Sequence, residues 1–112
     1  MTITATIDEP RNELEENFNI PICSEALYKQ VILAVANHHN LSTFSGWGTF
    51  SEIDEGAFEI FNGQLSVMKE GIINLPGISD ATKIHVLERL DTLQKAMAEM
   101  LGKRSDLVVL IG

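Results

Sequence analysis

The chain has 112 residues, 45% of them hydrophobic, which suits a single globular domain (residues 1–112) with one modest core. Its formal net charge of −8 disfavours binding to nucleic-acid phosphates or to an anionic membrane surface, because both need clustered lysine and arginine. The single cysteine excludes an intramolecular disulfide, and no apolar run is long enough to span a bilayer, so the sequence predicts a cytoplasmic protein.

Residues 1–7 alternate threonine with isoleucine or alanine, a pattern typical of a strand with the apolar side chains on one face. Asp8 and Pro10 then have the features of a helix cap and first turn. We interpret the acidic stretch that follows as the solvated face of a short helix. The alternative is a docking strip for a basic partner.

A longer helix is expected from residue 24 to residue 39. Ser24 is a preferred N-cap, and the residues before it read as extended because the residue preceding a proline avoids the helical region. The predicted buried stripe consists of Leu27, Tyr28, Val31, Ile32 and Val35.

His38 and His39 end this helix on the continuation of its apolar stripe. Imidazole rings are favourable at a helix C-terminus, which carries partial negative charge. The functional alternative is a ligand or metal site. Adjacent rings point about 100° apart on a helix, so a metal would need further ligands brought in by folding. We therefore keep both histidines as candidate binding residues and predict no metal.

Residues 41–50 form an unusual loop, in which Phe44, Trp47 and Phe50 recur every three residues with glycines on either side of the tryptophan. One interpretation is that these aromatics fold back and close the end of the helical core. The other is a recognition loop, because tryptophan is enriched in binding hot spots. The loop lacks the spacing and the lysine of a phosphate-binding loop. The three aromatics complete the set of candidate binding residues.

Residues 51–72 carry the pattern around which the fold is expected to form. At about 100° per residue, most of the apolar side chains fall on one half of a helix and most of the polar ones on the other. Ser51 occupies the expected N-cap position. The rival interpretation is a β-hairpin at residues 57–68, since Asn62-Gly63 is a strong hairpin signal. The helix accounts for more of the apolar residues.

Two glycines, Gly56 and Gly63, lie seven residues apart and so on one edge of this helix. Each costs about 1 kcal/mol relative to alanine in a helix interior. The first interpretation is a tolerated weakness, and the second is a groove where another backbone comes close.

Ser79 caps a last long helix that is expected to end near Gly102. The connection from the central helix is short, which predicts that the two helices pack antiparallel. The tail at 107–111 is apolar, and an exposed strand of this kind invites edge pairing. We expect it to be covered by its own chain or by a second copy.

These elements predict a mainly α fold, a small antiparallel helical bundle in which the last two helices pack on the helix at 24–39. Short terminal β-strands are compatible with it. The alternative is an α+β fold with a hairpin at 57–68. No nucleophile, base and metal set is recognisable, and Cys23 is expected to be a buried, inert thiol.

The expected function is therefore that of a non-enzymatic protein-interaction or accessory/regulatory protein, acting as a homodimer without a cofactor. One alternative is a small-ligand or metal-binding protein that uses residues 38–50. Another is an acidic inhibitor or antitoxin-type protein that sequesters a basic partner. Neither nucleic acid nor a membrane is expected as a partner.

Overall fold

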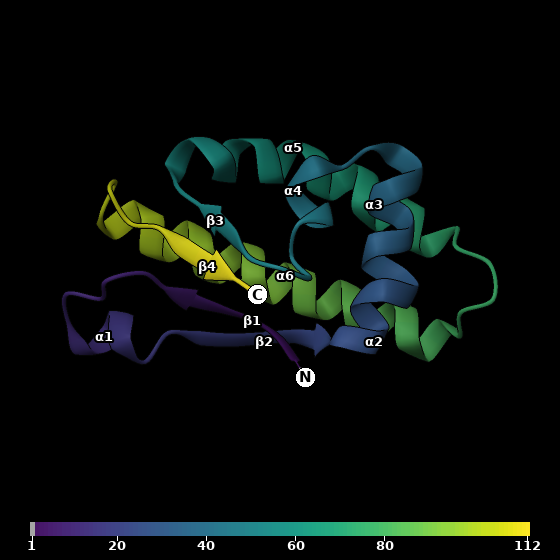
Figure 1. Cartoon of the computed structure of the whole chain (residues 1–112), viewed down its shortest axis with the longest axis horizontal. Helices are drawn as coiled ribbons and strands as arrows, with labels where there is room; N and C mark the ends of the chain where they lie inside the picture. Colours follow the sequence, from purple (N-terminus) through teal and green to yellow (C-terminus); the bar gives the residue numbers. More distant parts are fainter. Residues whose placement is uncertain (1) are drawn as a thin grey trace.

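A computed structural model describes residues 2–112 and shows an α+β fold (Figure 1). The mainly helical content and the short terminal strands agree with the prediction, but a four-stranded sheet packed with the helices replaces the predicted helical bundle. Four antiparallel strands form one sheet in the order β2-β1-β4-β3. The strands are β1 (Thr2–Ile7), β2 (Asn19–Ser24), β3 (Ser51–Ile53) and β4 (Val109–Ile111).

The alternation predicted for the N-terminal segment is confirmed. Ile3, Ala5 and Ile7 are buried, and the threonines between them are partly exposed. Met1, the first residue of the predicted strand, lies outside the described residues. The apolar tail forms β4, which lies between β1 and β3 and pairs Ile111 with Ala5. The tail is thus covered by its own chain, which was one of the two arrangements expected from the sequence.

The helix predicted at 24–39 is confirmed as a continuous run of α2 (Glu25–Leu27), the π-helical η1 (Tyr28–Ile32) and α3 (Leu33–His39). The Ser24 hydroxyl accepts a hydrogen bond from the Leu27 backbone N–H at 3.1 Å, as expected of an N-cap. The helix ends at a residue with left-handed backbone conformation, a geometry that asparagine tolerates better than most residues.

Helix α5 (Glu55–Ile73) confirms the central helix and shows that the alternative hairpin at 57–68 is wrong. It begins later than predicted. The N-cap is Asp54, whose carboxylate accepts from the Ala57 backbone N–H at 2.8 Å, and not Ser51. Ser51 lies in β3, because the buried Ile53 pairs with Val109 of the sheet.

Helix α6 (Asp80–Lys103) begins after the predicted N-cap and runs antiparallel to α5, as expected. Asn62 accepts a hydrogen bond from Gln94 at 2.8 Å, and Lys69 forms an ion pair with Asp91. The residue number on α6 falls from 94 to 91 as the residue number of its partner on α5 rises from 62 to 69, as expected for antiparallel helices.

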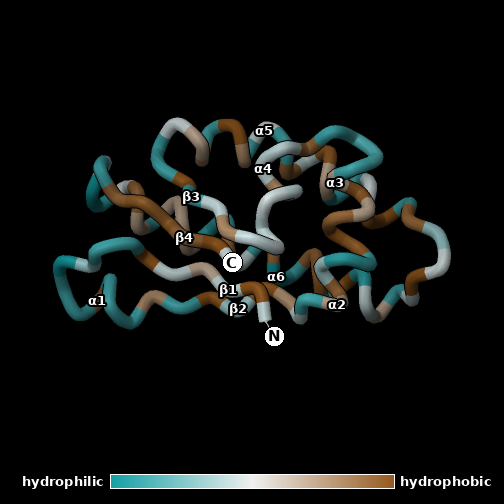
Figure 2. The backbone as a smooth tube through the Cα atoms, in the orientation of Figure 1, coloured by the Kyte–Doolittle hydropathy of each residue, from teal (hydrophilic) through white to brown (hydrophobic). Residues whose placement is uncertain are grey.

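Two short helices, α1 (Glu13–Glu16) and α4 (Ser42–Ser45), complete the fold. The predicted start of a helix at Asp8 is wrong, because Asn12 caps α1 and leaves only four helical residues. Figure 2 shows the resulting contrast between the hydrophobic β4 and the hydrophilic loop around α1. Within residues 2–112, no helix combines the length and the hydrophobicity needed to cross a lipid bilayer.

Candidate binding cleft

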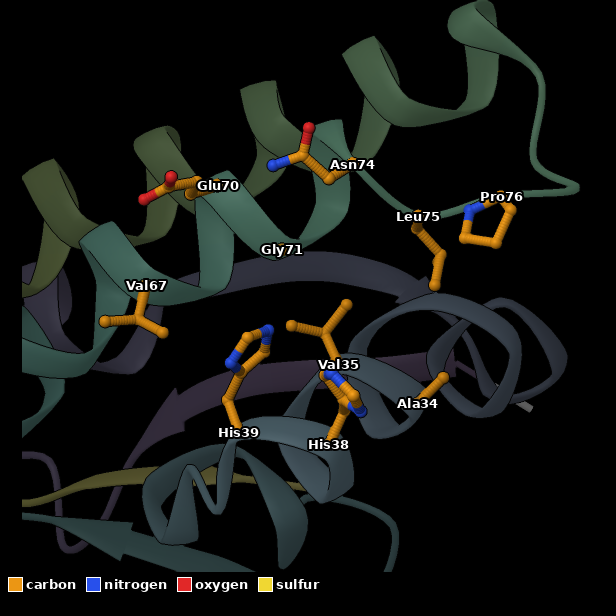
Figure 3. Close-up of a pocket in the computed structure, with 10 residues that line it drawn as sticks. All are labelled: Ala34, Val35, His38, His39, Val67, Glu70, Gly71, Asn74, Leu75 and Pro76. Atoms are coloured by element: carbon orange, nitrogen blue, oxygen red, sulfur yellow. The ribbon is translucent and has the colours of Figure 1, made fainter.

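A cleft of about 570 Å³ opens between α3 and the C-terminal half of α5 (Figure 3). This volume lies within the range of about 300–1,000 Å³ that is usual for ligand pockets. The lining is mostly apolar and comes from α3, α5 and the turn that follows α5. The lining residues are Ala34, Val35, His38, His39, Val67, Glu70, Gly71, Asn74, Leu75 and Pro76.

The two helices approach closely because residue 71 is glycine. A Cβ atom placed on Gly71 would lie 2.4 Å from Val35 Cγ1 and 3.4 Å from the His39 ring. The first distance is much shorter than any ordinary contact between carbon atoms. Any larger side chain at position 71 would therefore force α3 and α5 apart or force Val35 into a strained rotamer, so Gly71 permits the close approach of the two walls.

His38 and His39 lie in the last turn of α3, and both are exposed. Their ring centroids are 4.8 Å apart and the ring planes are almost perpendicular, at 89°. Figure 3 shows the His39 ring turned toward α5 beside Gly71. The rings thus offer the cleft hydrogen-bonding nitrogens at one wall, in two different orientations.

Apolar side chains mark the two ends of the cleft. Figure 3 shows Val67 at one end and Leu75 at the other, both directed from the α5 side toward α3. Val67 is 39% exposed, and Ile60, two turns earlier on the same side of α5, is 56% exposed. Gly63 lies between them, and a Cβ atom there would meet nothing within 4 Å. We name Ile60, Gly63 and Val67 the apolar strip; it leads into the cleft.

The carboxylate and the amide of the cleft lie apart from its two imidazole rings. Glu70 and Asn74 project from the outer side of α5 in Figure 3, away from the two imidazole rings. Within residues 2–112, no three His, Cys, Asp or Glu side chains are grouped closely enough to hold a metal ion. The further ligands that a metal on His38 or His39 would need are not assembled in this structure.

The aromatic residues of the predicted recognition loop do not join the histidines. Phe44 and Trp47 are fully buried, with ring centroids 4.9 Å apart, and Phe61 of α5 packs beside them. The Tyr28 hydroxyl donates to the Phe44 carbonyl at 2.6 Å. Phe44 and Trp47 thus fold back into the hydrophobic core, as the first interpretation predicted. Only Phe50, at 57% exposed, remains available at the surface.

Two further chemical groups lie outside the cleft. Burial raises the pKa of the Cys23 thiol to about 11, so the reactive thiolate is scarce near neutral pH. The predicted inert thiol is consistent with this. The second group is a cluster of charges around Glu15, the one buried carboxylate in the described part of the chain.

Glu15 joins α1 to the end of α6. Its carboxylate accepts from the Arg11 backbone N–H at 3.1 Å and from the Arg104 guanidinium at 2.9 Å. The Arg11 backbone hydrogen bond and the nearby Arg104 together lower the pKa of Glu15, although desolvation opposes them. Arg104 and Arg11 also pair with Asp106. The charged groups of this cluster pair with one another, which indicates a structural role.

Sequence reasoning found the histidines of the cleft but missed its opposite wall. Gly71 and Val67 belong to a helix that was predicted. The periodicity separated the apolar half of this helix from its polar half, but it did not identify the residues that line a cleft. The one available signal was a glycine in the last turns of that helix, and the sequence pattern does not distinguish it from Gly56 and Gly63. Comparison of the chain with protein-family models, with curated proteins and with solved structures found no match.

Proposed function

We propose that this protein is a non-enzymatic protein-interaction module that holds a helical, apolar segment of a partner in the cleft between α3 and α5. One observation carries the proposal. The apolar strip on α5 is exposed and continuous with the cleft, so one partner surface can cover both. Exposed apolar surface that gathers around a groove is typical of binding sites.

The extent of this surface favours a protein segment over a small molecule. Ile60 and Gly71 are separated by 11 residues, which corresponds to about 17 Å along the α5 axis. A small ligand held in the cleft would leave Ile60 in water. A partner helix of about three turns would reach from Ile60 to Gly71, with apolar anchors at i, i+4 and i+7.

A small apolar ligand is the second candidate, because the cleft volume alone is sufficient for one. The homodimer expected from the sequence loses one of its reasons, since the apolar tail is already buried as β4. Two chains that each carry a net charge of −8 also repel one another. A heterologous partner is thus favoured, and a cytoplasmic location stays a prediction.

The test uses a labelled model helix of about 15 residues, with leucines on one face and only glutamine and alanine elsewhere. We expect saturable binding, measured by fluorescence anisotropy. Val67→Asp should weaken it by about tenfold or more, because a carboxylate would be buried against leucine. Leu14→Asp is the matched control, since Leu14 is 53% exposed on α1, at the other end of the molecule from α3 (Figure 1).

Failure of the model helix to bind, or equal weakening by both substitutions, would contradict the proposal. Sedimentation equilibrium of the free protein distinguishes the other occupants. A dimer that Val67→Asp dissociates would show that the cleft binds a second copy. Binding of a neutral apolar dye that the model helix fails to displace would favour the small-ligand candidate.

A further inference from the structure

We infer that the segment held in the cleft is a basic amphipathic helix, with lysine or arginine side chains placed beside the carboxylates of α5. This inference rests on the proposed function and specifies the chemistry of the partner. It is carried by the distribution of charge on α5, an observation separate from the apolar strip itself.

The exposed side of α5 carries negative charge that the rest of the chain does not compensate. Glu55, Glu59 and Glu70 are exposed, and none forms an ion pair within residues 2–112. The only basic residue of α5 is Lys69, and it is already paired with Asp91 of α6. A cationic partner side chain would therefore meet carboxylates that are free to pair.

Two of these carboxylates border the apolar strip on the same side. At about 100° per residue, Glu59 and Glu70 lie within about 20° of each other around α5, and about 60–80° from Val67. They are 11 residues apart, or about 17 Å along the helix. A helix lying on the strip would place cationic residues on its adjacent flank within reach of both.

No basic side chain near the cleft forms an ion pair with Glu59 or Glu70 within residues 2–112. Lys83 donates to the Ile73 carbonyl at 2.9 Å, which places its ammonium group at the C-terminal end of α5 and not in an ion pair with Glu70. The other wall contributes His38 and His39 at the C-terminus of α3, where the helix dipole is negative. With a net charge of −8, the whole protein also attracts a cationic segment and repels an acidic one.

A second copy of the chain fits this surface poorly. A symmetric contact in which the two α5 helices run antiparallel would bring the Glu59 and Glu70 edges of two molecules together, and Lys69, the one basic residue of α5, is already paired. Like charges placed opposite each other in an interface oppose association. The apolar surface alone could bind either a second copy or a different protein. The charge pattern favours a basic helix from a different protein.

The experiment compares three labelled model helices that share one leucine face and differ on the flank, which carries lysine, glutamine or glutamate. For the unsubstituted protein at low salt, we expect the lysine helix to bind about tenfold more tightly than the glutamine helix. The glutamate helix should bind most weakly. Raising the salt to about 0.5 M should remove most of these differences.

The variant Glu59→Gln/Glu70→Gln should bind the lysine and glutamine helices about equally. Glu13→Gln/Glu16→Gln is the matched control, because it removes the same charge from exposed, unpaired residues of α1. It should keep most of the preference. Circular dichroism and thermal unfolding verify that both variants are folded.

Equal binding of the lysine and glutamine helices by the unsubstituted protein would overturn this inference and leave the proposed function standing. An equal loss of preference in the α1 control would also overturn it, since only net charge would then be acting. Absence of binding by all three helices would instead remove the proposed function.

Discussion

Replacing Gly71 with alanine tests the close contact between α3 and α5 on which the cleft depends. The added Cβ atom would lie 2.4 Å from Val35 Cγ1, about 1 Å short of a normal contact. Val35 is buried and β-branched, so its side chain has little freedom to rotate within the helix. The helices must separate locally, or Val35 must adopt a strained rotamer.

Gly63→Ala is the matched control, because it makes the same change in the same helix where a Cβ atom meets nothing within 4 Å. It should stabilise the protein by about 1 kcal/mol through helix propensity alone. Gly71→Ala gains the same term but adds overpacking of about 1–3 kcal/mol. The two variants should therefore differ by about 1–3 kcal/mol, or about 4–12 °C in Tm.

Urea unfolding followed by circular dichroism measures both free energies, and a double-mutant cycle assigns the cause. In a Val35→Ala background the clashing methyl is absent, so Gly71→Ala should become stabilising by about 1 kcal/mol. If Gly71→Ala stabilises the unsubstituted protein as much as Gly63→Ala does, the reasoning about the contact between α3 and α5 is refuted.

Three other predictions follow from the local structure. Glu15→Gln should lower Tm near pH 7, because it leaves Arg104 with a weaker partner. The pKa of Glu15 is lowered on folding, so its contribution to stability is present above the ordinary carboxyl pKa and is lost as the pH falls through the folded pKa. Glu15→Gln should therefore lose less stability on acidification than the unsubstituted protein. The same loss of stability at low pH in both proteins would argue against this role of Glu15. Cys23 should react slowly with a thiol reagent at pH 8 and rapidly in urea, whereas fast reaction of the native protein would contradict its burial. Asp54→Ala should cost about 1 kcal/mol in urea unfolding, and Ser51→Ala much less; the reverse order would restore the helix start predicted from sequence.

The long helices were predictable because their signals are local. The 3.6-residue apolar period, together with Ser24 and Ser79 as caps, located two of them to within a residue or two. The alternation in residues 1–7 likewise identified β1. The Asn62-Gly63 signal for a hairpin failed, because a helix brings the buried Phe61, Leu65 and Met68 to one face, whereas strand alternation would divide them between two faces.

The sheet and the cleft depend on contacts between distant residues, which is why the sequence did not reveal them. β3 has only three residues, too few for a pattern, and Ile53 joins the sheet by pairing with Val109. His38 and His39 were recognised from their place at a helix end. Gly71 was not, because its role appears only once Val35 of another helix is known to pack on it.

The binding surface itself is tested most directly by NMR titration of the protein with the lysine-flanked model helix. We predict that the methyl signals of Ile60 and Val67 and the amide of Gly71 shift along one saturable curve, while Leu14 stays unchanged. If the largest shifts instead fall at Phe50 or along the sheet, the cleft between α3 and α5 is not the site at which this protein binds a helix.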